Sequence, residues 1–216
     1  MDVVAGLAAG GAQVLVGHPF DTAKVHLQNQ RPWPGFRALY RGYRYPLVYA
    51  CSYNAFVFPV VERTHERFGY VLSGLLAGAC TTPLVFVFDL CAVKRQLQEP
   101  LRFVAHRGLT ATLTRESIAM ALYFSSYQAF RRHEWSPMTA GAAAGLVNWT
   151  VTYPIDTVRN RQFALNMSIR EATRPKRFYR GFSLCAVRAV LVNAAIFSTY
   201  EHIVGINTND RGADQT

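Results

Sequence analysis

Charged residues are scarce in this chain of 216 residues, where they make up only 17% of the sequence. A soluble domain usually carries about 25% charged residues, so this shortage indicates a membrane protein. However, no run of about twenty residues is apolar along its whole length, which argues against simple hydrophobic spans. The two observations together predict helices that face lipid on one side and a wet interior on the other.

Acidic residues are the rarer charge, with 13 acidic against 23 basic side chains and a net charge of +10. A basic surplus is typical of proteins that bind nucleic acid, anionic lipid or an anionic ligand. The chain lacks a block of lysine and arginine with interleaved aromatic residues, so nucleic acid is not expected as a partner. The arginines stand singly, often at the ends of apolar segments, as they do near membrane surfaces.

Cysteine is also rare, and the four cysteines have no metal-ligand spacing, so we expect them to be small core residues. The sequence contains no nucleophile–base motif, metal-ligand set or phosphate-binding loop. We therefore expect no metal, no cofactor and no enzymatic activity. The cysteines are Cys51, Cys80, Cys91 and Cys185.

The sequence repeats itself three times. Three apolar segments each carry a Gly-x-x-x-Gly pair, and in each an aspartate follows the second glycine by 11 residues. Such glycine pairs allow two helix backbones to approach closely in a membrane. The pairs are Gly6/Gly10, Gly74/Gly78 and Gly141/Gly145, and the aspartates are Asp21, Asp89 and Asp156.

A second apolar segment follows each of the first ones, with a glycine, alanine, phenylalanine and a Glu or Gln at the same offsets. The chain therefore reads as three copies of a two-helix unit. We expect an all-α membrane protein with six transmembrane helices and pseudo-threefold symmetry, each helix being long enough to span a bilayer. The expected helices are 2–28, 40–67, 69–98, 108–133, 136–164 and 179–204. The expected repeats are 1–68, 69–135 and 136–204, followed by a polar tail at 205–216.

The motif Pro-x-Asp-x-x-Lys/Arg on the first helices, together with Tyr-Arg-Gly before the second helices, resembles the mitochondrial carrier family. The resemblance covers residues 1–204, and its second repeat is degenerate. It implies a multi-pass protein of the mitochondrial inner membrane that moves a small-molecule substrate through a central cavity. This cavity closes alternately at the matrix face and at the outer face.

The resemblance implies a matrix gate in which the acid of each repeat pairs with the base of the next repeat. Lys24 is thus expected to pair with Asp156, and Arg159 with Asp89. Ala92 stands where Asp21 should find its base, and Lys94 is a candidate substitute two residues further on. The gate is therefore assigned to Asp21, Lys24, Gln28, Asp89, Lys94, Gln96, Asp156 and Arg159, with Phe163 in place of the third glutamine.

The outer gate is less complete, because two of the acids and only two plausible bases remain. It is assigned to Glu62, His65, Gln128, Arg131 and Glu201.

The resemblance places substrate contacts seven or eight residues after the glycine of each second helix. The Arg115–Glu116 pair suits a zwitterion, because a guanidinium binds a carboxylate and a carboxylate attracts an ammonium group. Alternatively, the two residues neutralise only each other or face the lipid headgroups. The segment around Asn54 also resembles carnitine, choline and basic amino-acid carriers, and its tyrosines either form a cation–π cage or simply pack. The substrate site is assigned to Tyr49, Tyr53, Asn54, Arg115, Glu116 and Arg188.

The loops on the matrix side are short. In the family each carries a surface helix that binds membrane lipid, cardiolipin in particular, together with the turn before the second helix. We expect these surface helices to be absent and the turns to remain as the lipid-binding residues. These are Arg41, Gly42, Arg107, Gly108, Arg180 and Gly181.

Two functions remain open. The first is a carrier of a zwitterionic or cationic metabolite of the amino-acid, carnitine or choline type. The second is a carrier-like subunit that no longer transports and joins a respiratory or other inner-membrane complex. The short loops and Ala92 favour the second, whereas Arg115, Glu116 and Arg188 favour the first.

Overall fold

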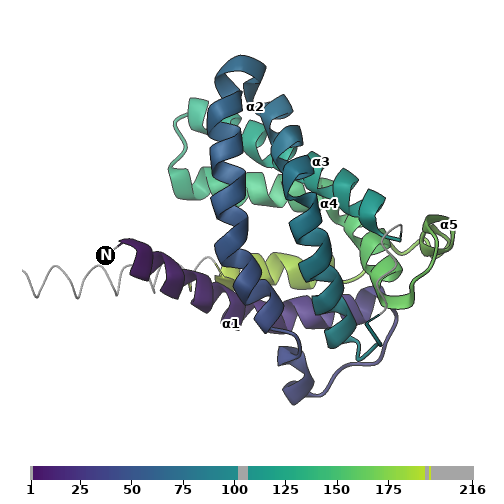
Figure 1. Cartoon of the computed structure of the whole chain (residues 1–216). Helices are drawn as coiled ribbons and strands as arrows, with labels where there is room; N and C mark the ends of the chain where they lie inside the picture. The colour runs from purple at the N-terminus through teal and green to yellow at the C-terminus, as the bar shows by residue number, and fades with distance from the viewer. Residues whose placement is uncertain (1, 102–106, 193–194, 196–216) are drawn as a thin grey trace, which may run out of the picture.

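The computed structural model describes residues 2–101, 107–192 and 195; for residues 2–10, 50–56, 58 and 59 only the backbone is described. This part of the chain is helical and contains no strand. Figure 1 shows the elements in order along the chain. They are α1 (Asp2–Gln28), the 3-10 helix η1 (Phe36–Tyr40), α2 (Arg44–Gln96), α3 (Leu109–Arg132), α4 (Pro137–Leu165), α5 (Ile169–Thr173) and a further apolar helix, Phe182–Val192.

Helix α2 covers most of two expected helices, 40–67 and 69–98, joined without a loop. Gly69 interrupts it with φ 72° and ψ 168°, a backbone conformation that is open to glycine and costly for other residues. The chain reverses direction at the top of α2 in Figure 1, so its two halves form a hairpin. The other expected helices agree with α1, α3 and α4 to within one residue at each end. The sixth expected helix is described at 179–192 and 195, where it is helical from Phe182, and the rest of it and the polar tail at 205–216 lie outside the described residues.

Helices α2 and α3 pack closely at the second glycine pair. A Cβ atom on Gly74 would lie only 2.6 Å from the Cα of Ala121 on α3. Glycine is therefore required here to let the two backbones meet. Gly145 has open space around it, so the third glycine pair does not make a similar contact.

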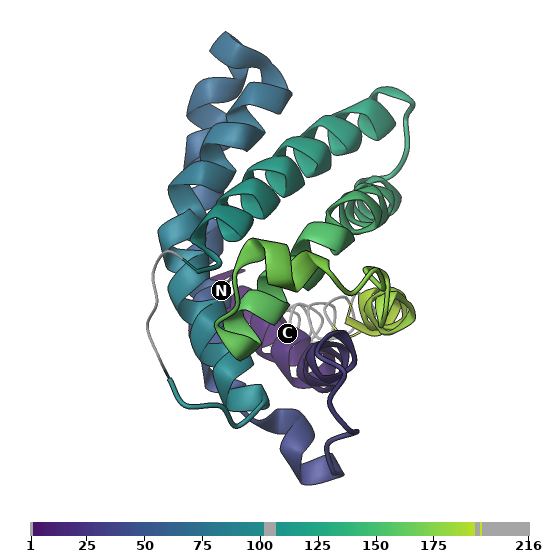
Figure 2. The same cartoon turned by 90° about the vertical axis from the view of Figure 1, so that its right-hand side faces the viewer.

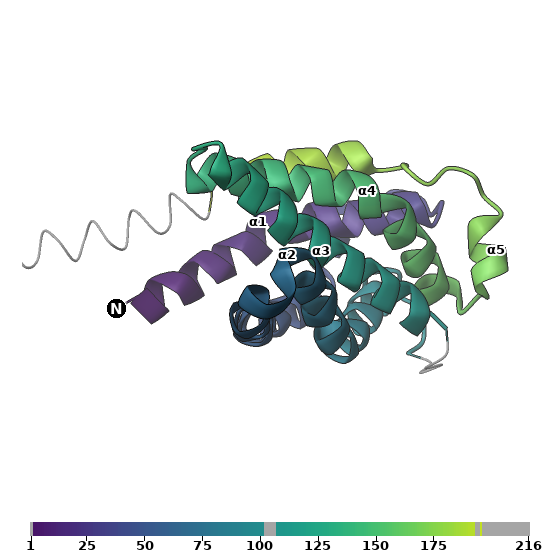
Figure 3. The same cartoon turned by 90° about the horizontal axis from the view of Figure 1, so that it is seen from above.

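The α2 hairpin and the α3–α4 hairpin lean apart in Figure 2, where α1 and the helix 182–192 appear side by side and nearly end-on. Figure 3 shows the same arrangement from above, with α1 crossing beneath α3 and α4. The first and last described helices are thus neighbours in space. This arrangement brings residues from the two ends of the chain to one cavity.

Two hydrogen bonds recur at equivalent positions of the first and third predicted repeats. His18 Nε2 lies 2.8 Å from the carbonyl oxygen of Arg41, and the Tyr153 hydroxyl donates to the carbonyl oxygen of Arg180 at 3.2 Å. The Thr22 and Thr157 hydroxyls donate in the same way, to Leu39 and Phe178 respectively. These bonds fix the chain entering the second helix against the first helix of the same repeat.

The second repeat has Phe86 and Leu90 at the two corresponding positions, and neither can donate. Both belong to an apolar cluster that includes Phe163, whose ring meets that of Phe86 edge-on at 5.5 Å. Burial of apolar surface therefore replaces the two hydrogen bonds in this repeat. The same cluster explains Phe163, which stands where a glutamine was expected.

The expectation that the short surface helices are absent is wrong for the first and third loops. The first loop contains η1, and the third contains α5. Helix α5 has a capping box: the Ser168 hydroxyl accepts from the Glu171 backbone, and the Ser168 backbone donates to the Glu171 carboxylate. This backbone bond, with the one from the Ser168 hydroxyl, lowers the pKa of Glu171. A capping box stabilises the first turn and so makes a five-residue helix feasible in a short loop.

One described helical range, Val60–Gln96, is apolar and long enough to include a membrane span, even though Gly69 divides it, whereas Phe182–Val192 is a shorter apolar helix. The other long helices carry buried polar and charged residues, of which α4 has the most. Of the cysteines whose side chains are described, Cys185 is buried as expected, but Cys80 is exposed and Cys91 is half-buried.

Candidate functional site

A cavity of about 490 Å³ lies among α1, α2, α3, α4 and the helix 182–192. Its walls bring together residues from all three repeats. Ten of the residues predicted from the sequence line it: Asp21, Lys24, Tyr49, Asp89, Gln96, Arg115, Glu116, Asp156, Arg159 and Arg188.

The resemblance predicts that the acid of each repeat pairs with the base of the next repeat, which we call the cyclic rule. The structure contains both ion pairs that this rule predicts. Lys24 Nζ lies 2.6 Å from Asp156 Oδ2, and Arg159 Nη1 lies 2.9 Å from Asp89 Oδ2. Arg159 Nη2 also donates to Asp156 Oδ1 at 2.8 Å. The Asp156 side chain is only 1% exposed, so these pairs compensate charges that would be costly to bury alone.

Asp21 does not pair with Lys94, so that expectation is wrong. Lys94 Nζ instead donates to the carbonyl oxygen of Ala164 at 3.1 Å. Two residues along a helix correspond to a rotation of about 200°, so Lys94 leaves the helix on the face opposite to Ala92. Asp21 pairs with Arg188, whose Nε lies 2.8 Å from Asp21 Oδ1.

Gln28 contacts the Lys24–Asp156 pair directly, because its Nε2 donates to Asp156 Oδ2 at 3.4 Å. Its side chain donates to Thr157 at 3.2 Å and accepts from Asn160 at 2.7 Å. Gln96 is buried beside the cavity, but its side-chain oxygen has no hydrogen-bond partner. Gln28 therefore braces an ion pair, as the resemblance implied, whereas the Gln96 oxygen makes no such bond in this conformation.

Arg115 and Glu116 contact each other and also two residues of the predicted matrix gate. They form an ion pair, Arg115 Nε lies 4.0 Å from Asp156, and Arg159 Nη1 lies 3.5 Å from Glu116. Neither residue faces the lipid headgroups, because Glu116 is fully buried and both line the cavity. The mutual pairing that the sequence left open is thus present, within a larger network of both charges.

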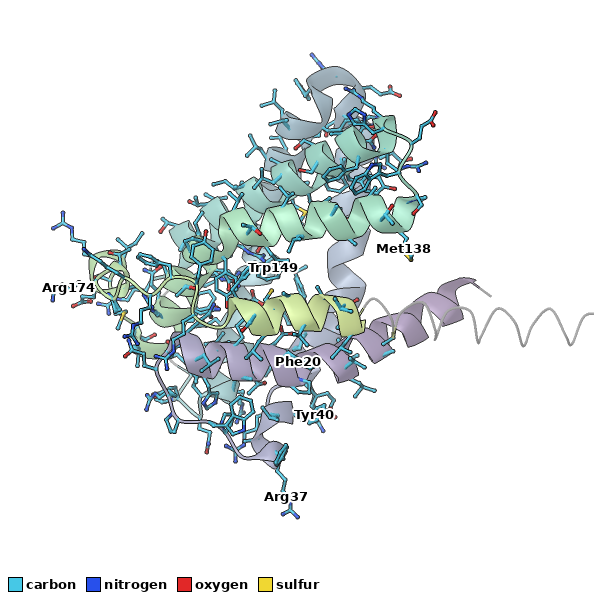
Figure 4. All side chains as sticks on the ribbon, turned by 180° about the vertical axis from the view of Figure 1, so that it is seen from behind. Phe20, Arg37, Tyr40, Met138, Trp149 and Arg174 are labelled. Carbon is cyan, nitrogen blue, oxygen red and sulfur yellow. The ribbon has the colours of Figure 1, made fainter. Side chains whose placement is uncertain are left out.

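Aromatic side chains form part of the wall. Tyr49 is half-buried and its ring lies 6.1 Å from that of Phe88, whereas the side chains of Tyr53 and Asn54 lie outside the described residues. Sequence reasoning missed Trp149, which has Lys24 Nζ 4.4 Å and the Arg115 guanidinium 5.0 Å from its ring. Figure 4 shows Trp149 where α4 faces the helix 182–192. Its position seven residues before Asp156, on the same helix face, was the available signal.

The predicted outer gate is not assembled in the described part of the chain. His65 contacts the carbonyl oxygen of Glu62 at 2.8 Å and stacks on Tyr70, while Glu62 itself is exposed. Arg131 donates to the carbonyl oxygen of Trp135 at 2.6 Å. Gln128 is half-buried on α3, and Glu201 lies outside the described residues. In an alternating-access carrier the outer gate is open when the matrix gate is closed, and the matrix-side ion pairs are formed here. The assignment of the outer gate therefore stays a prediction.

The three glycines of the predicted lipid-binding turns share one backbone conformation. Gly42, Gly108 and Gly181 have φ of 81°, 94° and 88°, in the left-handed region. Next to them, Arg41 is exposed, and Arg107 and Arg180 are half-buried. Figure 4 shows Arg37 and Tyr40 on the first loop, on the other side of α1 from Trp149. The turns are thus structurally equivalent, and lipid binding by them stays a prediction.

Comparison with known proteins agrees with this architecture. The family model described as "Mitochondrial carrier protein" matches residues 132–174. The chain is 31% identical to the human mitochondrial basic amino acids transporter, over 92% of this chain and 88% of the relative. It is 27% identical to the mitochondrial arginine transporter BAC2 of Arabidopsis thaliana, over 93% and 89% of the two chains, and 28% identical to a mitochondrial carnitine/acylcarnitine carrier-like protein of the same plant, over 93% and 96%.

The chain belongs to the mitochondrial carrier family and is therefore a protein of the mitochondrial inner membrane. The alignment with the human relative extends over 267 positions, more than the 216 residues of the whole chain. The chain thus lacks segments that the relative contains, in agreement with its short loops.

Proposed function

We propose that the chain is a six-span carrier that moves a basic amino acid, or a closely similar zwitterionic or cationic metabolite, across the inner membrane by alternating access. One observation carries this proposal: the cavity has acids and bases side by side on its wall. A ligand with an ammonium group and a carboxylate can exchange for both partners of such pairs. The names of the relatives, which transport basic amino acids or arginine, support the same substrate class.

In this proposal Arg115 binds the substrate carboxylate and Glu116 binds a substrate ammonium group. Both already have partners of the same chemistry, so binding exchanges one ion pair for another without leaving a buried charge alone. Trp149, which already contacts two cations, offers its ring face to a third. Tyr49, Tyr53 and Asn54 complete the proposed site.

The Lys24–Asp156 and Arg159–Asp89 pairs are proposed to hold the matrix side shut in this conformation, and Glu62, His65, Gln128, Arg131 and Glu201 to close the outer side in the other. Arg41, Arg107 and Arg180, with the adjacent glycines, are proposed to bind lipid phosphates such as those of cardiolipin.

Nucleotides fit this cavity poorly. A phosphate next to the buried carboxylates of Glu116 and Asp156 would cost on the order of several kcal/mol unless a proton or a cation intervened. We therefore expect no exchange of ADP.

The first prediction concerns Glu116→Gln in protein reconstituted into liposomes. We expect uptake of radiolabelled arginine and lysine to fall about tenfold or more, because the substrate ammonium group loses a charged partner. The exposed Glu66→Gln is the matched control and should transport normally. An unchanged rate for Glu116→Gln, or rapid ADP exchange by the wild type, would contradict the proposed substrate.

A second function is a transport-silent subunit of a respiratory or other inner-membrane complex. It is favoured by the loss of the gate base at Ala92 and by the shortened loops. Gentle solubilisation of mitochondria followed by native electrophoresis separates the two functions. A monomeric carrier migrates alone, whereas a subunit migrates with a large complex and shows no uptake after reconstitution.

A further inference from the structure

Arg188 lies between the proposed matrix gate and the proposed substrate site. It lies on the helix 182–192 and lines the cavity, yet its Nε is 2.8 Å from Asp21 Oδ1 on α1. Asp21 is the acid whose expected base is replaced by Ala92, and Ala92 lines the same cavity. The third acid of the gate thus has a partner, but from a different helix than the cyclic rule requires.

The packing of α1 makes room for this contact. A Cβ atom on Gly17 would lie 3.1 Å from both Nε and Nη2 of Arg188 and 3.1 Å from Val192. The corresponding positions of the other repeats hold Val85 and Thr152, four residues before the aspartate in each case. Gly17 therefore leaves space on α1 for the Arg188 side chain, which approaches Asp21 more closely than Arg115 approaches Asp156.

The Arg188–Asp21 contact joins an arginine of one repeat to the aspartate of the next, and a similar contact is present elsewhere in the molecule. Arg188 and Arg115 each follow the glycine of their helix by seven residues. Arg115 Nε lies 4.0 Å from Asp156, the acid of the repeat that follows its own. Arg188 makes the same step from the third repeat back to Asp21 of the first, so its contact follows the symmetry of the fold.

The Arg188–Asp21 pair is the most accessible of the three links. Its side chains are 22% and 36% exposed, compared with 8% and 1% for Lys24 and Asp156. Arg188 Nε does not have hydrogen-bond geometry toward Asp21, although the charges are in contact. An anionic group entering the cavity can therefore reach Arg188 more readily than the buried links.

We propose that Arg188 replaces the missing base of the matrix gate, and that the substrate carboxylate, bound by Arg115, also takes Arg188 away from Asp21 and so opens this link. The second half rests on the proposed transport function, whereas the first half does not. In this arrangement one residue both holds the gate and senses the substrate. A cation without a carboxylate can enter the cavity but leaves the link closed.

The gate link is tested by thermal unfolding of the purified protein in detergent, which needs no transport. Arg188→Gln should lower the unfolding midpoint by about 2–4 °C, because Asp21 loses its partner. Adding Ala92→Lys to Arg188→Gln should recover most of this loss, because a lysine is restored where the cyclic rule places it. Ala92→Lys alone should change the midpoint much less, and the exposed Arg132→Gln is the control.

An equal shift from Ala92→Lys in both backgrounds would overturn the gate link, as would an Arg188→Gln variant as stable as the wild type. Either result would mean that Asp21 does not depend on Arg188 and that a base at position 92 does not replace it.

The carboxylate trigger is tested by uptake of arginine and of agmatine, the amine that remains when arginine loses its carboxylate. The wild type should take up agmatine at least about tenfold more slowly than arginine, because agmatine has no group to receive Arg188. Asp21→Asn releases Arg188 in advance, so the ratio of agmatine to arginine uptake should rise about tenfold. A role for Arg188 in substrate binding alone would leave this ratio unchanged.

An unchanged ratio, or loss of both uptakes in Asp21→Asn, overturns the trigger. If the wild type transports neither compound while the unfolding experiment shows the coupling of positions 92 and 188, the gate link stands and the transport function fails. If the wild type transports arginine while the unfolding shifts are independent, the gate link fails and the transport function stands.

Discussion

At the residue scale, two buried arginines on α4 bind different kinds of partner: one binds carboxylates and the other binds backbone carbonyl oxygens. Arg159 contacts the carboxylates of Asp89, Asp156 and Glu116. Arg161, two residues further along α4, is equally buried but is bonded to backbone oxygens. Its guanidinium donates to the carbonyl oxygens of Gln28, Ala172, Pro175 and Arg177. The first arginine links carboxylates of the proposed gate, and the second ties the third loop to the end of α1.

We predict that Arg161→Lys lowers the free energy of unfolding by about 1–3 kcal/mol, because one ammonium group cannot reach carbonyls on several sides and leaves some of them unpaired. Thermal unfolding in detergent measures this loss. Arg174→Lys, in the same loop but exposed, should change nothing. Equal stability of the two variants would show that the four hydrogen bonds contribute no net stability.

At the element scale, the helices owe their contacts to small residues as well as to charge. The backbone contact at Gly74 brings α2 against α3, the helix that carries Arg115 and Glu116. The position of the candidate substrate residues therefore depends on a residue that never meets the cavity. Gly145 belongs to the same sequence motif but has no such neighbour.

We predict that Gly74→Ala destabilises the protein by about 1–3 kcal/mol, because the added methyl group forces two backbones apart. Gly145→Ala should be neutral or slightly stabilising, since alanine favours a helix over glycine by about 1 kcal/mol. Thermal unfolding of the two variants side by side decides the matter. If both substitutions have the same effect, the glycine pairs do not differ in their packing as described.

At the scale of the whole molecule, the chain joins helices from its two ends around one cavity. Helix α1 and the helix 182–192 lie side by side in Figures 2 and 4. The Asp21–Arg188 pair connects them. Because the first and last described helices are in contact, the helices surround the cavity, as expected for three equivalent hairpins arranged about an axis.

We predict six membrane spans with both termini on the same side of the inner membrane, because three successive hairpins return the chain to its starting side. Tags fused to each end, probed by protease in mitochondria with a ruptured outer membrane, should be digested together. Accessibility of only one tag would indicate an odd number of spans and would contradict the six-helix arrangement.

The sequence by itself determined the helices and the two ion pairs Lys24–Asp156 and Arg159–Asp89. Helix bounds follow from local features such as Gly42, Gly69 and Gly108, which take backbone conformations that other residues avoid. The partners of Asp156 and Asp89 followed from the resemblance to the mitochondrial carrier family, in which each acid pairs with the base of the next repeat, once the motif was located in this chain. Both kinds of information are present in the order of the residues.

Only the tertiary structure decided what happens where the repeats differ. Ala92 stands where the symmetry places the base for Asp21, and its side chain cannot form an ion pair. Lys94, the lysine nearest to Ala92 in the sequence, points away from Asp21 and donates to the carbonyl oxygen of Ala164. The partner is Arg188, which is 167 residues away in sequence and reaches Asp21 because Gly17 leaves space for it. The contacts of Trp149 with Lys24 and Arg115, and of Phe163 with Phe86, likewise depend on how the helices pack. Such contacts depend on distances between helices, which the residue order does not specify.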